Sequence, residues 1–302
     1  MDARGLETLR AVHDRGGVSA AAVALHVTPS AVSQQLRVLQ RAAGVVLVER
    51  VGRGVRLTPA GLAVAEAAGE VAVALERART AGEAFLARPV GTVRVTAFQS
   101  AAQMLLPGLL TRVAALDGVS VECGDEDVAQ SEFPALTLDW DIVVAHRADA
   151  GQRWPTSARQ LRVVPLLREP LDVALPPGHR LADRESVRPE DLAGESWITV
   201  REGFPVAHVL DAVATRSGDS PRIVQRINDF HVVEALVAAG HGISLLPRYT
   251  TDHGGRFRLV PLVGVAAGRQ IDALLRPDRA ERRLVGEVLE LLRAEARRQS
   301  AG

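Results

Sequence analysis

A run of polar side chains between residues 30 and 41 has the residue types and the spacing needed to contact nucleic acid. On a helical wheel these side chains gather on one face, opposite the apolar positions of the same run. Hydroxyl, amide and guanidinium groups can bond base edges in a major groove or the phosphates beside it, with the amide suited to adenine and the guanidinium to guanine. For the two arginines, a phosphate contact is the alternative to a base contact. The polar face consists of Ser30, Ser33, Gln34, Arg37 and Arg41.

Three short helices are predicted around this face. Apolar positions at helical spacing predict a first helix that ends at Gly16. A second helix is expected over residues 20–26, with Ser19 as its N-cap. The third begins after Thr28, an N-cap followed by proline, and ends before Gly44. A tight connection between the second and third helices describes a helix-turn-helix.

A β-hairpin is predicted directly after the third helix, over residues 47–57 with a glycine-rich turn, which makes it a wing. We expect Arg50, Arg53 and Arg56 on this wing to contact the DNA backbone or the minor groove. Residues 1–58 carry eight arginines against four acidic residues, although the formal net charge of the whole chain is zero. A single polar helix face would more simply be solvated, but the wing and the local positive charge favour DNA binding.

From Thr58 to about Ala87 the sequence predicts one long helix with a narrow apolar seam. Such a seam favours pairing with a second copy of the helix, and packing against the helix's own domain is the alternative. The apolar positions alternate in spacing between four and three residues, with Gly82 at one seam site. They are Val64, Ala68, Val71, Leu75, Ala78 and Phe85.

Strand-like and helix-like runs alternate through the remainder of the chain. This alternation predicts a parallel-rich α/β sheet with helices on both faces. The expected strands are residues 92–97, 119–122, 142–145, 171–175, 197–200 and 243–246.

The segment around the predicted helix-turn-helix resembles the DNA-binding region of LysR-type transcriptional regulators. The matching run, VSAAAVALHVTPSAVSQQLRVL, begins at Val18, and it is followed by Gly44, by LVER and by RLTPAG. The family's helix-turn-helix would correspond to residues 18–37. Two residues depart from the family pattern, because Gln40 stands where a glutamate is usual and Val48 where a phenylalanine is usual.

This resemblance implies a bacterial-type transcription regulator. Double-stranded promoter DNA would be its target, contacted by Thr28 in addition to the polar helix face and the wing. The chain would act as a homodimer or homotetramer whose operator contains two related half-sites, with RNA polymerase as a further partner. A small-molecule effector would modulate its activity.

The resemblance continues more loosely through the C-terminal part of the chain. The runs PLLREPL, LPPGHRL, DLAG and AGHGISLLP are similar to family landmarks. They imply a sensor of two α/β lobes, similar to periplasmic solute-binding proteins, with a ligand cleft between the lobes. The implied domains are a winged helix-turn-helix over 1–58, a linker and dimerisation helix over 59–90, and an effector-binding domain over 91–302, with lobe I formed by 91–163 and 266–302 and lobe II by 164–265.

The strand ends predict, independently of the resemblance, where a ligand would bind. Open α/β sheets bind ligands beyond the carboxyl ends of their strands, where helix N-termini offer free amides. For any one of these residues a structural role is the alternative, and Arg201 suits a carboxylate ligand. The candidates are Phe98, Gln99, Ser100, His146, Thr199, Arg201, Phe230 and His231.

Other classes of function find little support in the sequence. An enzyme would need a nucleophile motif, metal-ligand spacing or a phosphate-binding glycine loop, and none is found, so we expect neither catalytic residues, nor a metal, nor a cofactor. The acidic run over 122–127 lacks the spacing of a calcium loop. A solute-binding protein would carry an export signal, and the N-terminal sequence has none.

The cellular setting expected from the sequence is the cytoplasm. No apolar stretch reaches the length of a membrane span. The single cysteine, Cys123, cannot form an internal disulfide, and its interpretation as a small strand residue is favoured over a redox role.

Overall fold

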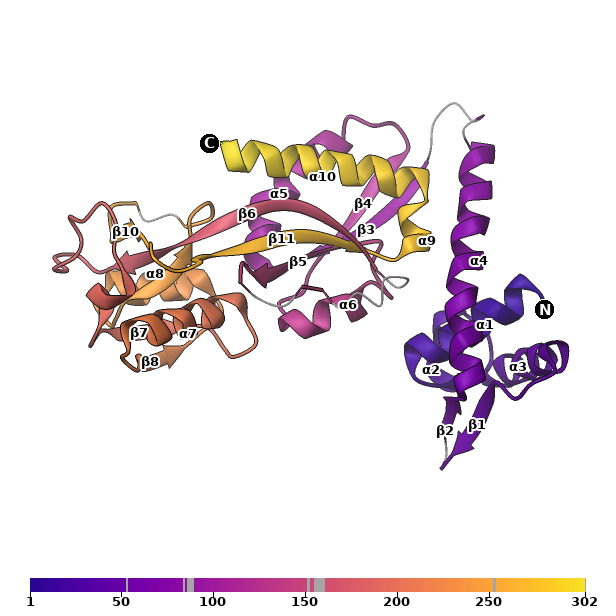
Figure 1. Cartoon of the computed structure of the whole chain (residues 1–302). Helices are drawn as coiled ribbons and strands as arrows, with labels where there is room; N and C mark the ends of the chain where they lie inside the picture. The colour runs from indigo at the N-terminus through magenta and orange to yellow at the C-terminus, as the bar shows by residue number, and fades with distance from the viewer. Residues whose placement is uncertain are drawn as a thin grey trace. The chain divides into compact units, whose positions relative to one another are not determined.

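The structure is a computed structural model of the chain, and its elements form two compact units (Figure 1). The first unit contains α1 to α4, the wing, α9 and the first turn of α10, and the second contains the elements from β3 to β11 and most of α10. The wing residue Arg53 lies outside the described part of the chain. The residues that the structure describes are 1–52, 54–83, 85, 90–150, 153–154, 161–251 and 254–301.

The first unit begins with the three predicted helices, α1 (Ala3–Arg15), α2 (Val18–Ala24) and α3 (Pro29–Ala43). Their apolar faces share one core, in which Leu9 and Val32 are fully buried. Burial of these faces stabilises the short helices, which would be marginal in isolation.

The ends of α3 follow the predicted capping chemistry. Thr28 Oγ1 accepts a 3.2 Å hydrogen bond from the Ala31 amide, and Gly44 ends the helix with a φ of 71°. The start of α2 was predicted wrongly. This helix begins at Val18 after Gly17, so Ser19 lies inside its first turn and does not cap it.

The wing is an antiparallel pair of β1 (Val48–Val51) and β2 (Gly54–Leu57), and it leads directly into the long helix α4 (Pro59–Glu83). Gly61 lies where this helix approaches the wing, because a Cβ atom added at Gly61 would lie 2.0 Å from the carbonyl oxygen of Leu47. Only glycine fits at this approach.

The seam of α4 is buried in its first half and exposed in its second. Ala68 is buried, whereas Val71 and Leu75 are 36% and 43% exposed within the chain. The helix is described as far as Glu83, and Phe85 lies in a turn rather than on the seam. The rest of the predicted continuation to Ala87 lies outside the described residues.

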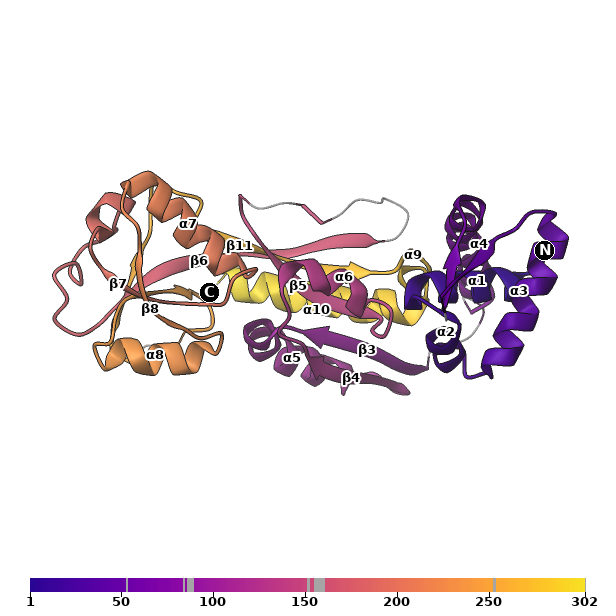
Figure 2. The same ribbon diagram turned by 90° about the horizontal axis from the view of Figure 1, so that it is seen from below.

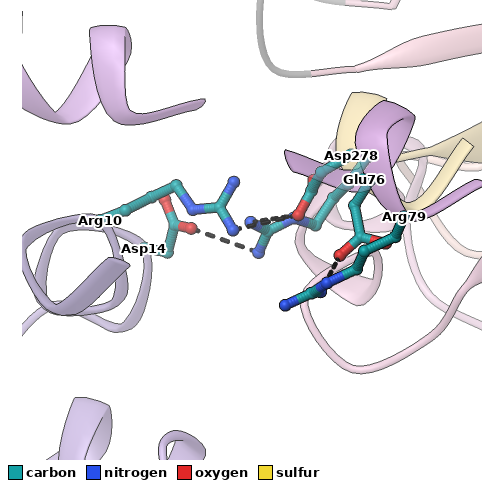
Figure 3. A network of polar contacts seen from close by, with 6 residues as sticks. Arg10, Asp14, Glu76, Arg79 and Asp278 are labelled. Atoms are coloured by element: carbon teal, nitrogen blue, oxygen red, sulfur yellow. Dashed lines mark hydrogen bonds and ion pairs between the residues drawn. The ribbon is translucent and has the colours of Figure 1, made fainter. Parts of the chain in front are cut away.

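The first unit also includes α9 (Pro277–Ala280) and the first turn of α10 (Arg283–Ala301), which pack beside α4. Figure 3 shows the polar contacts around α9. Arg10 donates to Asp278 at 3.0 Å, and Arg276 lies 3.4 Å from Asp14. The hydroxyl of Thr80 on α4 donates to the carbonyl oxygen of Glu281 at 2.7 Å.

A seven-stranded sheet organises the second unit, with the order β10-β6-β11-β5-β3-β4 and with β9 paired to β6. The strands β6 and β11 are neighbours that run along the unit (Figures 1 and 2). They connect two groups of elements, one formed by residues 91–148 and the other by residues 196–247. The bounds of the strands are β3 (Gly91–Ala97), β4 (Val119–Asp125), β5 (Ile142–Ala148), β6 (Arg162–Leu175), β9 (Ser244–Pro247), β10 (Arg258–Pro261) and β11 (Gly268–Leu275).

A second, two-stranded sheet and several helices complete this unit, which gives the expected α/β architecture. A buried cluster that includes Trp197, Val209 and Leu245 forms the core around the smaller sheet. No helix in the described part of the chain combines the length and the apolar character of a membrane span. The remaining elements are β7 (Ser196–Thr199), β8 (Arg222–Arg226), α5 (Gln99–Val113), α6 (Phe133–Leu136), α7 (Pro205–Ser217), α8 (Phe230–Ala238) and the short 3-10 helices η1 (Gln130–Glu132) and η2 (Pro189–Leu192).

The pairing is more mixed than the sequence predicts. β3 is parallel to both β4 and β5, and β7 is parallel to β8, as expected for strands joined by helices. The pairs β5 with β11 and β6 with β9 and β10 are antiparallel. These antiparallel pairs all involve β6 or β11, the two strands that connect the groups of elements.

Candidate functional site

The polar face of α3 is exposed, as the sequence predicts. Ser30, Gln34, Arg37 and Arg41 are exposed, whereas the apolar positions on the other side of the helix are buried. Ser33 is half-buried, and its hydroxyl donates a 2.9 Å hydrogen bond to the Pro29 carbonyl.

Within the described part of the chain, some side chains on this face already make hydrogen bonds and others make none. The Thr28 and Ser30 hydroxyls lie 2.9 Å apart, so these two groups bond each other at the helix start. Arg41 Nε lies 3.4 Å from the Arg37 carbonyl, which is a weak contact. In the described residues, no hydrogen bond or ion pair engages the Gln34 amide or the Arg37 guanidinium, and both side chains are exposed, so these two groups are available to a ligand.

The wing presents further guanidinium groups. Arg56 pairs with Glu49 on the neighbouring strand at 2.7 Å, and both side chains are exposed. Arg50 is exposed, and no ion pair to it is found among the described residues. Because Glu49 offsets the charge of Arg56, Arg50 is the better placed of the two for a phosphate.

Gln40 positions the wing relative to α3. Its Oε1 atom accepts hydrogen bonds from the amides of Leu47 at 2.9 Å and Val48 at 3.1 Å. An amide oxygen supplies this acceptor as a carboxylate oxygen would, so the departure from glutamate at this position leaves the contact intact.

The second unit contains a cavity at the strand ends, with about 320 Å³ of open space when its mouth is included. It lies where α5, α7 and α8 begin, so the structure brings together residues from both groups of elements. Five of the eight predicted ligand residues line it. The full lining is Phe98, Gln99, Ser100, Asp127, His146, Val200, Phe204, Pro205, Val206, Asn228, Phe230 and Arg269.

The other three predicted residues lie elsewhere. Thr199 is buried at the end of β7, and its hydroxyl has no partner in the described residues. Arg201 is 64% exposed, lies 4.0 Å from Asp127 and stacks over the Phe204 ring. His231 is exposed beside Asp229.

A buried ion pair joins the two connecting strands beneath the cavity. Arg269 of β11 and Glu169 of β6 are 1% and 0% exposed, and Arg269 Nη2 and Nε lie 2.6 Å and 2.9 Å from Glu169 Oε2. Arg269 Nη2 also donates to the hydroxyl of Ser100 at 2.7 Å. Such a pair is costly to break, because the remaining charge would be buried without a partner.

His146 lies against this pair. Its ring stacks on Phe98 with centroids 4.1 Å apart, and its Nδ1 atom is 3.5 Å from Arg269 Nη1. Burial and then the charge of Arg269 hold the pKa of His146 well below its usual value, so the ring is neutral. Since arginine only donates, Nδ1 is the acceptor and Nε2 carries the proton.

Sequence reasoning missed Arg269, Glu169, Phe204, Asp127 and Asn228. The first two carried a usable signal, since each is a charged residue within a run that reads as a buried strand. Phe204, Asp127 and Asn228 lie in loops or at a helix start, where no spacing rule marks them.

Two further predictions concern metals and the cysteine. In the part of the chain that the structure describes, no group of His, Cys, Asp and Glu side chains is arranged to hold a metal ion. Cys123 lies exposed on β4, and partial burial of its thiol raises its pKa, which disfavours the reactive thiolate.

Two family models match the chain. The model described as "Bacterial regulatory helix-turn-helix protein, lysR family" matches residues 3–62, and the model described as "LysR substrate binding domain" matches residues 87–297. The first match contains α1 to α3 and the wing, and the second contains the cavity.

Known proteins match along nearly the whole chain. The transcriptional activator protein LysR of Escherichia coli is 27% identical over 276 residues, which cover 91% of this chain and 86% of that protein. A full-length OxyR variant from Pseudomonas aeruginosa has a similar structure, with a TM-score of 0.67, 20% identity and coverage of 98% of this chain and 95% of that one. CbnR in complex with its target DNA gives a TM-score of 0.51 at 23% identity, covering 98% of this chain and 100% of that chain.

Proposed function

Because the chain belongs to the LysR family of transcriptional regulators, we propose that it binds promoter DNA as a homo-oligomer and changes that binding when an effector occupies the cavity of the second unit. It has a helix-turn-helix for DNA and a substrate-binding domain, and its relatives are transcriptional regulators rather than enzymes. Its place of action is then the cytoplasm, where promoter DNA lies. RNA polymerase is a further partner, since a relative is named as a transcriptional activator.

The proposal assigns a function to each part of the chain. Residues 1–58 form the DNA-binding domain, 59–90 the linker and dimerisation helix, and 91–302 the effector-binding domain. The two lobes of that last domain are 91–163 with 266–302, and 164–265. The family-model matches and the position of the cavity support this division.

The exposed face of α3 is the observation that carries the DNA-binding proposal. The side chains of Gln34 and Arg37 are exposed, face away from the core and have no hydrogen-bond or ion-pair partner in the described residues, so they are our candidates for base contacts. Thr28, Ser30, Ser33 and Arg41 would contact bases or phosphates beside them. Arg50 and Arg56, together with Arg53 outside the described residues, would hold the backbone.

The exposed half of the α4 seam supports the oligomer. Val71 and Leu75 are apolar, exposed within one chain and aligned along one helix face. A second copy of α4 would cover them and would place two copies of α3 on related half-sites.

The test begins with selection of operator DNA from genomic fragments by the full-length protein, followed by affinity measurements on the selected duplex and on a random duplex. We expect Arg37→Ala to weaken binding to the operator by about 1–3 kcal/mol and to weaken random binding much less. We expect Arg50→Ala to weaken binding to both duplexes. It should also make the slope of log affinity against log salt concentration shallower by about 0.9, the value for one phosphate contact. Equal losses on both duplexes from Arg37→Ala would remove its base-reading role.

A further inference from the structure

Two polar side chains that line the cavity of the second unit, His146 and Ser100, offer hydrogen-bond donors. His146 is 4% exposed and borders the cavity, and its Nε2 atom has no hydrogen-bond partner in the described residues. The hydroxyl of Ser100 accepts from Arg269, which leaves its own hydrogen free to donate. A buried donor without a partner is costly, so a ligand that supplies an acceptor would be stabilised there.

Two helices add to the donors. Helices α5 and α7 begin at the cavity with Gln99 and Pro205, and no side chain caps either start. Their first amides and their dipoles favour oxygen atoms with negative charge or partial negative charge. The start of α8 differs, because Asp229 accepts hydrogen bonds from the amides of His231 and Val232 and so occupies that site.

The charges around the cavity are largely paired already. Arg269 is neutralised by Glu169, and His146 is neutral. Asp127 accepts a 3.1 Å hydrogen bond from Asn228 and lies 4.0 Å from Arg201. A cation in the cavity would therefore meet two helix N-termini and a guanidinium, and it would find no unpaired carboxylate in the described lining.

The remaining walls are flat and apolar. The rings of Phe98, Phe204 and Phe230 line the cavity together with two valines. Phe98 already stacks on His146, and Phe204 meets the His146 ring edge-on at 6.2 Å. Aromatic walls of this kind favour a planar or compact apolar body.

We propose that the effector is a small molecule with a flat apolar body and a carbonyl or carboxylate oxygen, and that this oxygen accepts hydrogen bonds from His146 Nε2 and the hydroxyl of Ser100. The inference rests on the proposed function, because it assigns the chemistry of the effector at the cavity already described. Both a neutral carbonyl and a carboxylate satisfy the donors, and a cationic group satisfies none.

The test compares three ring compounds that differ only in the attached group: benzamide, benzoate and benzylamine, which is an ammonium ion at neutral pH. Their affinities for the full-length protein are measured by calorimetric titration. We expect benzamide or benzoate to bind in the millimolar range and benzylamine to bind at least tenfold more weakly. Whichever of benzamide and benzoate binds more tightly then shows whether the acceptor group of the natural effector is neutral or anionic.

His146→Phe removes the donor and keeps a ring that can stack on Phe98. We expect it to weaken the benzamide and benzoate affinities about three- to tenfold, which is the size of one hydrogen bond. The matched control is His241→Phe, an exposed histidine away from the cavity, which should change nothing. If His146→Phe does not fold, the comparison of the three compounds on the unmodified protein still decides.

Three outcomes would overturn the assignment: benzylamine binding as well as benzamide and benzoate, unchanged affinities in His146→Phe, or no binding of any compound up to 20 mM, an upper limit on the order of weak fragment affinities. Operator binding is measured on the same preparations. A protein that binds operator DNA and none of the compounds disproves the ligand class alone, and a protein that binds no DNA disproves the proposed function.

Discussion

Arg10 on α1 and Asp278 on α9 lie 268 positions apart in the sequence, and they form a 3.0 Å ion pair (Figure 3). Their side chains are only 18% and 12% exposed, so solvent screens the pair incompletely. Arg276, which begins this contact region, follows directly after β11. The strand that carries Arg269 beneath the cavity thus leads, within seven residues, to a contact with the first helix of the DNA-binding fold.

A double-mutant cycle of Arg10→Ala and Asp278→Ala should give a coupling energy of about 1 kcal/mol in the free energy of unfolding. The control cycle uses Arg293 and Glu290, which lie 2.8 Å apart on α10 with far more exposed side chains. That pair should couple by no more than about 0.5 kcal/mol, because exposed ion pairs are weak. Equal coupling in the two cycles would show that burial adds nothing to the Arg10 contact.

The same carboxylate gives a pH dependence. Burial raises the pKa of Asp278, but the neighbouring Arg276 and Arg10 outweigh it, and the net pKa lies below the usual value. A lowered pKa means that the ionised carboxylate stabilises the fold at neutral pH and that this contribution is lost as the pH falls below about 4. Asp278→Asn should therefore lower the urea midpoint at pH 7 and lower it less at pH 3.5. A difference that stays constant with pH would contradict this account.

Local chemistry explains which elements the sequence predicts well. The limits of α3 depend on Thr28 and Gly44, whose capping roles are decided by residues next to them. Arg269 and Glu169 are a hundred positions apart, and only the pairing of β6 with β11 makes them partners. Sequence patterns therefore do not predict the part of the site that depends on contacts between strands far apart in the sequence.

Gln40 shows how a departure from a family pattern can be interpreted only with the structure. Its side chain binds two backbone amides at the start of the wing, so Gln40→Leu should destabilise the fold by about 1–3 kcal/mol through two unsatisfied amides. Gln40→Glu keeps the acceptor and should cost much less. Thermal unfolding of the two variants distinguishes them, and a Leu variant as stable as the Glu variant would mean that water satisfies the amides.

Two glycines on α4 form a matched pair. Gly61→Ala would place its Cβ atom 2.0 Å from the Leu47 carbonyl oxygen, so the helix or the wing must move, at a cost of about 2 kcal/mol or more. Gly69 has no atom within 4 Å of an added Cβ, so Gly69→Ala should stabilise the helix by up to about 1 kcal/mol. Denaturant unfolding should show opposite signs for the two variants, and equal signs would contradict the close approach at Gly61.

Leu75 and Leu62 test the role of the α4 seam. Both leucines are on α4 and are similarly exposed, 43% and 42%, but they lie on opposite faces of the helix. If a second copy covers the seam, Leu75→Glu buries a charge at that interface and should weaken self-association at least tenfold, about 1.4 kcal/mol. Leu62→Glu should leave the mass of the assembly unchanged in sedimentation equilibrium. Operator affinity should fall with Leu75→Glu as well, because each DNA-binding domain would then bind its half-site independently. If the assembly of Leu75→Glu kept its mass, the exposed seam would not be the dimer interface, and the oligomer would form through another surface of the chain.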